Sequence, residues 1–230
     1  MNGMTHPLFR DRTHAGAILA EELKAFVDPQ FLILALPRGG VLVAAEVARR
    51  LDLELDVLVF RKLSVPRQEE LTIGAAGTGG VHVVYQGLAQ LMGVDDRQCG
   101  ALIAEAELLV QRRHRQYRGD APAPSFFCRS VCLIDDGLPT GSTMAAAIEV
   151  VRRHYPSRII AAVPVSPPEI CAAFQRRVDL RAFVCPHQPQ QFSSVGMWYE
   201  DFSEVTDEQA CALLRETSQA RVRPEGSVSI

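Results

Sequence analysis

Short apolar runs alternate along the chain with longer segments whose apolar residues recur at helical spacing. The apolar runs are typical of strands buried in a parallel sheet, and the periodic segments predict amphipathic helices. The predicted strands are residues 31–36, 55–60, 131–134, 158–163 and 180–184. The predicted helices are residues 13–26, 41–51, 95–117, 142–154 and 168–175, and a last one after the capping-box pair Thr206 and Gln209. This alternation predicts an α/β fold with a doubly wound, mainly parallel sheet joined by right-handed crossovers.

The most informative stretch is residues 131–143, which reads as a buried strand, two acids, a turn and the start of a helix. Hydroxyl groups and glycines in the turn can direct O–H and N–H groups toward a ligand. The helix N-terminus behind them adds unsatisfied N–H groups and a positive dipole end, which together favour a phosphate. These turn residues are Gly137, Thr140, Gly141, Ser142 and Thr143.

The two acids, Asp135 and Asp136, change that picture, because they would repel a phosphate on its own. They indicate a ligand that also carries vicinal hydroxyls, a bound divalent cation, or both. A phosphosugar meets this description. The alternative is an ordinary strand–turn–helix in which Asp136 and Ser142 only cap the helix.

The run D-D-G-L-P-T-G-S-T at 135–143 resembles the phosphoribosyl-pyrophosphate (PRPP) motif of type I phosphoribosyltransferases. The resemblance extends over roughly residues 10 to 216 and implies that this run holds the phosphate and ribose of PRPP. Pro139 departs from the family pattern, which more often has a small residue there, and proline lacks an N–H donor. The residues implied to bind PRPP are Asp135, Asp136, Gly137, Leu138, Pro139, Thr140, Gly141, Ser142 and Thr143.

A second strand–turn–helix, Pro37-Arg38-Gly39-Gly40, follows the first predicted strand. Arg38 supplies a planar cation and the glycines supply accessible N–H groups, a combination suited to an anion. A tight turn with a solvated arginine is the alternative. In a parallel sheet this turn and the central motif can meet at the carboxyl edge, where ligands usually bind. The resemblance implies that pyrophosphate is bound by Arg38, Gly39, Gly40, Arg61 and Lys62.

The glycine-rich segment within residues 61–85 is too long for an ordinary connection and predicts a functional lid. It could be a hairpin that pairs residues 72–76 with 81–85. The resemblance implies a flexible loop that closes over PRPP, excludes water and brings in cations. Its cations are Arg61, Lys62 and Arg67, and the implied catalytic residues are Asp135, Asp136 and Lys62.

Residues 187–217 are expected to form a small C-terminal hood and a last helix, attached to a phosphoribosyltransferase core of residues 1–186. Residues 218–230 are expected to be a disordered tail. The hood holds the single tryptophan, Trp198, with Phe192 and Phe202 nearby. These aromatics could contact the acceptor, as the family's hood does, or simply cover the end of the sheet.

Composition and charge bear on the partners and the cellular location of the protein. A net charge of −3 and a pI near 6.1 argue against general nucleic-acid or membrane surfaces, and no apolar run approaches the roughly 20 residues of a membrane span. The N-terminus lacks a signal pattern. The six cysteines form no C-x-x-C pair, so we expect reduced thiols, no zinc site and a cytoplasmic location.

The expected activity is Mg²⁺-dependent transfer of ribose 5-phosphate from PRPP to an unidentified small-molecule acceptor, such as a nitrogenous base, with release of pyrophosphate. Mg²⁺ would be held mainly by PRPP and water, with no direct protein ligand. Family members are often dimers, which leaves a homodimer open. The main alternative is a non-catalytic PRPP- or nucleotide-binding regulatory protein. Haloacid-dehalogenase phosphatases need D-x-D and P-loop hydrolases need G-x-x-x-x-G-K-[ST], and the sequence offers neither at this motif.

Overall fold

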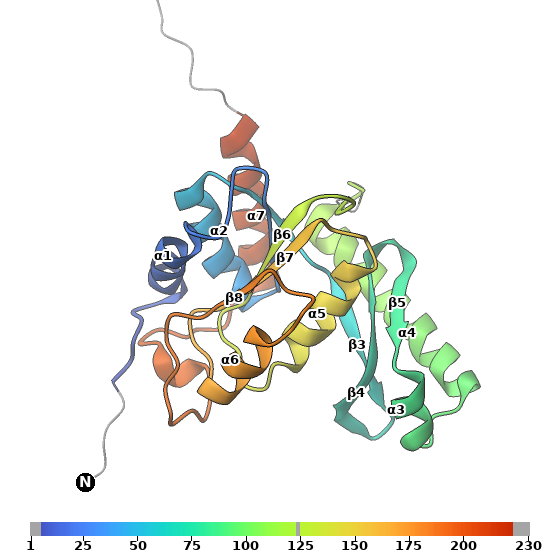
Figure 1. Cartoon of the computed structure of the whole chain (residues 1–230). Helices are drawn as coiled ribbons and strands as arrows, with labels where there is room; N and C mark the ends of the chain where they lie inside the picture. The colour runs from blue at the N-terminus through green and yellow to red at the C-terminus, as the bar shows by residue number, and fades with distance from the viewer. Residues whose placement is uncertain (1–5, 123–124, 223–230) are drawn as a thin grey trace, which may run out of the picture.

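Five parallel strands form the central sheet, in the order β2-β1-β6-β7-β8 (Figure 1). The structure is a computed structural model that describes residues 6–122 and 125–222. The strands are β1 (Leu32–Ala35), β2 (Glu54–Val57), β6 (Ser130–Ile134), β7 (Arg158–Ala162) and β8 (Ala182–Val184). β1 lies between β2 and β6, so Ile33 pairs with Leu55 on one side and with Cys132 on the other. The predicted parallel sheet is confirmed.

Helices cover both faces of this sheet. α1 (Arg12–Leu23), α2 (Gly39–Leu51) and α7 (Asp207–Val222) pack on the face that receives Ile33 and Ala35. α5 (Ser142–Arg152) and α6 (Pro168–Gln175) pack on the face that receives Leu32 and Leu34. Both faces of β1 and β6 are therefore buried, which is why these strands read as continuous apolar runs.

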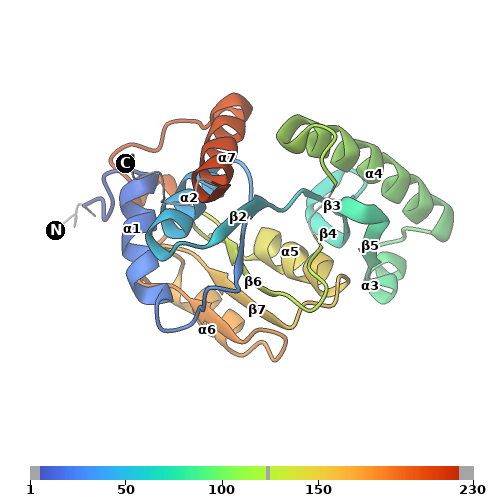
Figure 2. The ribbon, with the colours of Figure 1, turned by 90° about the horizontal axis from the view of Figure 1, so that it is seen from above.

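A second sheet stands beside the first (Figure 2). It is antiparallel, in the order β3-β4-β5, and packs against α4. Its elements are β3 (Phe60–Val65), β4 (Gln68–Gly77), the short 3₁₀ turn η1 (Thr78–Gly80), β5 (Val81–Val84), α3 (Gln86–Leu91) and α4 (Asp96–Arg118).

The predicted hairpin is confirmed, because Gly74 to Gly77 of β4 pair with Val81 to Val84 of β5. One expectation in this region was wrong. The predicted strand 55–60 ends at Val57, and Phe60 already belongs to β3, which pairs with β4 as a third strand. Residues 86–91 form α3, in which apolar side chains such as Ala89 are buried against the second sheet.

The chain returns over the sheet edge after β8 and forms a cover, which we call the hood (residues 187–206). It contains the 3₁₀ turn η2 (Gly196–Trp198) and packs Trp198 and Tyr199 against Phe9 from the N-terminal segment. Phe9 also forms a parallel bridge with Tyr199. The hood is therefore anchored by a segment from the opposite end of the chain.

The helix ends follow local capping chemistry. α1 is capped by Asp11, whose carboxylate accepts from the His14 N–H at 2.7 Å, so the helix predicted for residues 13–26 begins at Arg12 instead. The capping box of Thr206 and Gln209 is confirmed. α7 continues to Val222, beyond the expected boundary at 217, and residues 223–230 of the expected tail lie outside the described residues. Within the described ranges, no helix has the length and apolar character needed to span a membrane.

Candidate functional site

The turns that follow β1 and β6 touch each other at the carboxyl edge of the sheet. A Cβ on Gly39 would lie 2.0 Å from Asp136 Oδ2, and one on Gly40 would lie 2.8 Å from the Ile134 carbonyl oxygen and 2.9 Å from Asp135 Cα. Only glycine allows this approach. The structure thus brings together the two turns that the sequence marked separately, with the first turn lying directly on the acids of the second.

Arg12 of α1 is the ion-pair partner of the second acid. Its Nε donates to Asp136 Oδ2 at 2.8 Å, and its Nη1 donates to the Ser203 carbonyl oxygen at 2.9 Å. The guanidinium also lies over the Phe202 ring, 3.8 Å from the centroid. Since the Arg12 and Asp136 side chains are only 8% and 15% exposed, this is a largely buried pair that ties α1, β6 and the hood together.

The two carboxyls have perturbed acidities. Burial raises the pKa of Asp135 well above its ordinary value, and the neighbouring charge of Asp136 raises it further. Burial also raises the pKa of Asp136, while Arg12 opposes that rise. Asp135 Oδ1 accepts the backbone N–H of Asp136 at 2.9 Å. Ionisation of both carboxyls is therefore unfavourable in the folded protein. A ligand that donates hydroxyl hydrogen bonds or brings positive charge would stabilise the ionised carboxylates.

The loop from Thr140 to Thr143 offers donors for an anion. α5 begins at Ser142 with Gly141 as its N-cap in a left-handed conformation (φ 81°), and no side chain caps it. Its first N–H groups therefore lack intrahelical partners. A Cβ on Gly141 would come within 2.6 Å of the Phe174 ring, so glycine is required here both by backbone and by space. Asp136 therefore does not cap α5, in contrast to the alternative interpretation of this stretch as an ordinary strand–turn–helix.

The backbones of Leu138 and Pro139 do not offer an N–H group to a ligand. The Leu138 N–H donates to the Val165 carbonyl at 3.0 Å, and its own carbonyl accepts the buried Ser166 hydroxyl at 2.8 Å. Pro139 is exposed and has no N–H. The remaining donors of this loop come from residues 140–143, where the Thr140 hydroxyl already donates to Ser142 Oγ at 3.3 Å and the Ser142 N–H donates to Thr140 Oγ1 at 3.5 Å.

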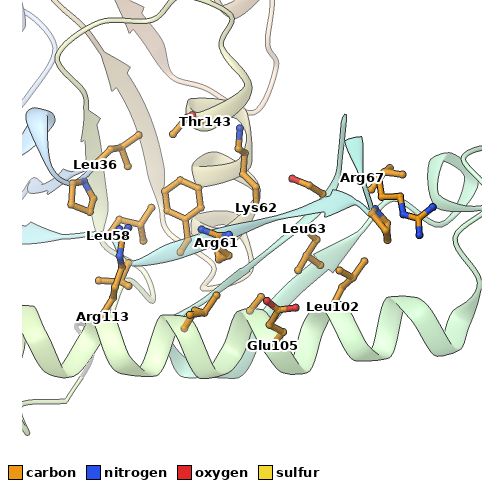
Figure 3. A pocket seen from close by; sticks show the side chains of 18 residues that line it. Leu36, Leu58, Arg61, Lys62, Leu63, Arg67, Leu102, Glu105, Arg113 and Thr143 are labelled. Carbon is orange, nitrogen blue, oxygen red and sulfur yellow. The ribbon is translucent and has the colours of Figure 1, made fainter. Parts of the chain in front are cut away.

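Basic side chains approach the site from two directions. Lys62 Nζ lies 3.3 Å from Ser142 Oγ, so the β3 lysine reaches the loop at the start of α5. Arg61, the preceding residue of the strand, points to the side of α4 (Figure 3). Arg38 pairs with Glu204 of the hood at 2.7 Å and remains partly exposed. The structure therefore joins Lys62 to the central loop and Arg38 to the hood, and it separates Arg61 from Lys62.

Sequence reasoning missed three residues here. Besides Arg12, they are Ser166, which supports the loop from below, and Tyr199, whose hydroxyl donates to the Asp136 carbonyl oxygen at 2.5 Å. A signal existed for Arg12, because it shares the buried face of α1 with Ala15 and Leu19. A cation on an apolar face needs a buried anion.

The hood rests directly on the acidic turn. Val195 closes over Gly137, where a Cβ would lie 2.5 Å from the valine Cγ1, and Trp198 is 4% exposed. This favours the covering role for the hood aromatics over a role as an open base-stacking surface. Within residues 6–122 and 125–222, no three His, Cys, Asp or Glu side chains cluster in a way that could hold a metal ion.

Ser166→Ala is expected to lower stability modestly. The hydroxyl is fully buried, and its loss leaves the Leu138 carbonyl short of a partner, which should cost about 1 kcal/mol. In a chain of this size that corresponds to a melting temperature lower by roughly 2–4 °C. Calorimetry of Ser166→Ala beside the exposed-site control Ser193→Ala tests it, and an unchanged melting temperature would show that the bond does not support the loop.

Three comparisons place the chain among known proteins. The family model described as "Phosphoribosyl transferase domain" matches residues 12–192. Two curated proteins from Mycobacterium tuberculosis strains, each named "Putative phosphoribosyl transferase", are 38% identical over 207 residues. The match covers 90% of this chain but 46% of theirs, so the chain spans about half the length of these relatives. The crystal structure of TT1426 from Thermus thermophilus has 41% identity and a TM-score of 0.81, over 90% of this chain and 98% of that one.

Proposed function

This chain belongs to the phosphoribosyl transferase domain family, and from that premise we propose that it transfers ribose 5-phosphate from PRPP to a small-molecule acceptor, releasing pyrophosphate. The observation that supports the proposal most is the close approach of Gly39 to the Asp136 carboxylate, since it brings the two predicted loops side by side at the sheet edge. A nitrogenous base is the acceptor class we favour, because its ring nitrogen can attack the sugar carbon without a protein nucleophile.

The 5′-phosphate would lie at the N-terminus of α5. The N–H groups and hydroxyls of Thr140, Ser142 and Thr143 supply donors, and Gly141 allows the backbone to turn toward the phosphate. Lys62, at 3.3 Å from Ser142 Oγ, adds a positive charge at this loop. Gly137, Leu138 and Pro139 shape the turn, and the bond from Ser166 to the Leu138 carbonyl supports it.

The ribose hydroxyls would donate to Asp135 and Asp136. As the bond to pyrophosphate breaks, positive charge develops on the sugar ring, and the two carboxylates stabilise it from a fixed position. Arg12 and the Tyr199 hydroxyl hold Asp136 in that position. Binding also removes the penalty of keeping two adjacent carboxylates partly buried and charged.

Pyrophosphate would leave on the side of the first turn. The N–H groups of Gly39 and Gly40 and the guanidinium of Arg38 are the donors there, with Lys62 and Arg61 brought by the lid strand β3. Arg38 would have to exchange Glu204, an exposed partner, for the leaving group. Such an exchange requires little free energy, because exposed ion pairs contribute little to stability.

A magnesium ion would be carried in with the substrate and would need no direct protein ligand, because Mg²⁺ keeps several waters and binds substrate oxygens. Asp136 is already paired with Arg12, so the two acids would favour the ion's charge through bound water. When bound, the ion neutralises charge on the pyrophosphate. We propose that PRPP and water supply most of its ligands and that the chain supplies no dedicated cage.

The domain division is also part of the proposal. Residues 1–186, with the lid at 61–85, would bind PRPP, and residues 187–217 would close the acceptor side. The second candidate function is a PRPP- or nucleotide-binding regulatory protein without turnover. The placement of Val195 against Gly137 favours it, because the hood lies close over the acids.

A pyrophosphate-release assay separates the two candidates. The protein is incubated with PRPP, Mg²⁺ and a panel of purine and pyrimidine bases, and PRPP binding is measured by calorimetry in parallel. A transferase releases pyrophosphate with at least one acceptor, whereas a sensor binds PRPP and releases none. Failure to bind PRPP with or without Mg²⁺ would contradict both the transferase and a regulatory protein that senses PRPP.

A further inference from the structure

A groove of about 500 Å³ runs between the lid strand β3 and helix α4 (Figure 3). Its volume lies in the range of small-molecule sites. One margin touches the proposed PRPP site at Pro37, Arg61, Lys62 and Thr143, and the rest, which includes Arg67 and Arg113, lies outside it. β3 is an edge strand of the second sheet, so one of its two long edges pairs with no strand among the described residues.

The groove is strongly positive. Its lining holds four cations, Arg61, Lys62, Arg67 and Arg113, against one acid, Glu105. Figure 3 shows Arg61 and Arg113 toward one end and Arg67 toward the other. Among the described side chains, no acid lies within ion-pair distance of these three arginines. Arg113 acts on Asp207 only at longer range, where its charge helps to lower the pKa of that carboxyl.

Apolar side chains line part of the groove. Leu102 and Leu109 of α4 are partly exposed there, whereas Leu36, Leu58, Leu63 and Ala106 are buried behind its surface. Pyrophosphate has no apolar surface and would gain nothing from contact with these leucines. The leaving group of the proposed reaction therefore explains the cations nearest Lys62 but not the rest of the groove.

We propose that this groove binds a flat aromatic molecule that carries a carboxylate or phosphate. The ring would lie against Leu102 and Leu109, and the anionic group would take two parallel hydrogen bonds from a guanidinium, the geometry in which arginine recognises both anions. Because the ligand would share Lys62 and Thr143 with PRPP, it weakens PRPP binding, and PRPP weakens its binding by the same factor. This second part rests on the proposed function, whereas the binding itself does not.

Calorimetric titration with two matched pairs of probes tests the site. Adenosine 5′-monophosphate is compared with adenosine, and naphthalene-2-carboxylate with its carboxamide. The two pairs distinguish a phosphate ligand from a carboxylate ligand. At least one anion is expected to bind at least tenfold more tightly than its neutral analogue, since a charge-assisted bond to arginine is worth on the order of a factor of ten.

Arg113→Glu locates the site on α4, with Arg112→Glu as the matched control. Both residues are exposed on the helix, but only Arg113 lines the groove. We expect Arg113→Glu to weaken anion binding at least roughly tenfold and Arg112→Glu to change it less than about twofold. Arg113→Gln is the second variant, should the reversed charge disturb folding as judged by circular dichroism.

Equal binding of the neutral analogues, or unchanged anion binding in both Arg113 variants, would overturn the site. The second result would show that the anions bind at the PRPP loop instead. If the anions bind through Arg113 and leave PRPP affinity unchanged, the coupling is wrong while the site stands. If they bind through Arg113 in a protein that does not bind PRPP, the proposed function fails and the groove is confirmed on its own.

Discussion

Asp136→Asn is expected to reduce PRPP-dependent pyrophosphate release at least about a hundredfold. The amide keeps the shape of the carboxyl but cannot balance the positive charge that develops on the ribose, and removal of one fixed electrostatic group typically lowers turnover by this amount. The substitution also leaves the largely buried Arg12 without its counter-charge, which should lower the free energy of unfolding by about 2 kcal/mol.

Asp201→Asn is the control for this variant. Asp201 lies in the hood and is exposed; its carboxylate accepts hydrogen bonds from Ser203, and Arg12 acts on it only through its charge at longer range. It should retain turnover and stability. Steady-state kinetics with an acceptor from the panel, together with urea denaturation, separates the two effects. An Asp136→Asn protein with full activity would mean that the ribose does not lie against this carboxyl.

Arg12→Met is expected to destabilise the protein by about 3 kcal/mol at pH 8 and by much less near pH 4. Removing one partner of a buried ion pair leaves an uncompensated charge, which is costly. Methionine retains an apolar stem that can still contact Phe202, so most of the loss reflects charge.

The pH dependence follows from the raised pKa values of Asp135 and Asp136 in the folded protein. In the unfolded chain these carboxyls titrate near their ordinary value of about 4. A carboxyl whose folded-state pKa is raised favours folding when protonated, and its ionisation penalises the folded state as the pH rises through that pKa. Arg12 offsets the penalty only when the carboxyls are charged, so its removal matters most at high pH.

Urea denaturation of wild type and Arg12→Met across pH 4–8 measures this dependence. The control is Arg129→Met, which removes an exposed pair with Glu54 and should change stability by less than about 1 kcal/mol. A deficit in Arg12→Met that is the same at every pH would show that its stabilisation comes from packing rather than from the charge of the acids.

The local elements of this protein follow from its residue pattern. The apolar runs at β1 and β6 and the helical stripes between them specify the buried parallel strands, because a strand covered on both faces has no polar side. The two glycine-containing turns could be recognised by residue type alone, and parallel strands necessarily place their carboxyl ends on one edge. The hairpin of β4 and β5 was also predicted, from the glycine-rich segment within residues 61–85.

The partners of the site were decided only by tertiary structure. Arg12 and Asp136 are 124 residues apart, and Tyr199 reaches the Asp136 carbonyl across 63. Periodicity shows which face of α1 is buried, but not which carboxylate lies beneath it. The pairing of Arg12 with Asp136 depends on how α1 packs across the sheet and on how far the hood extends over the sheet edge. The groove between β3 and α4 has the same origin, since its walls come from segments that the pattern assigns separately to a strand and a helix.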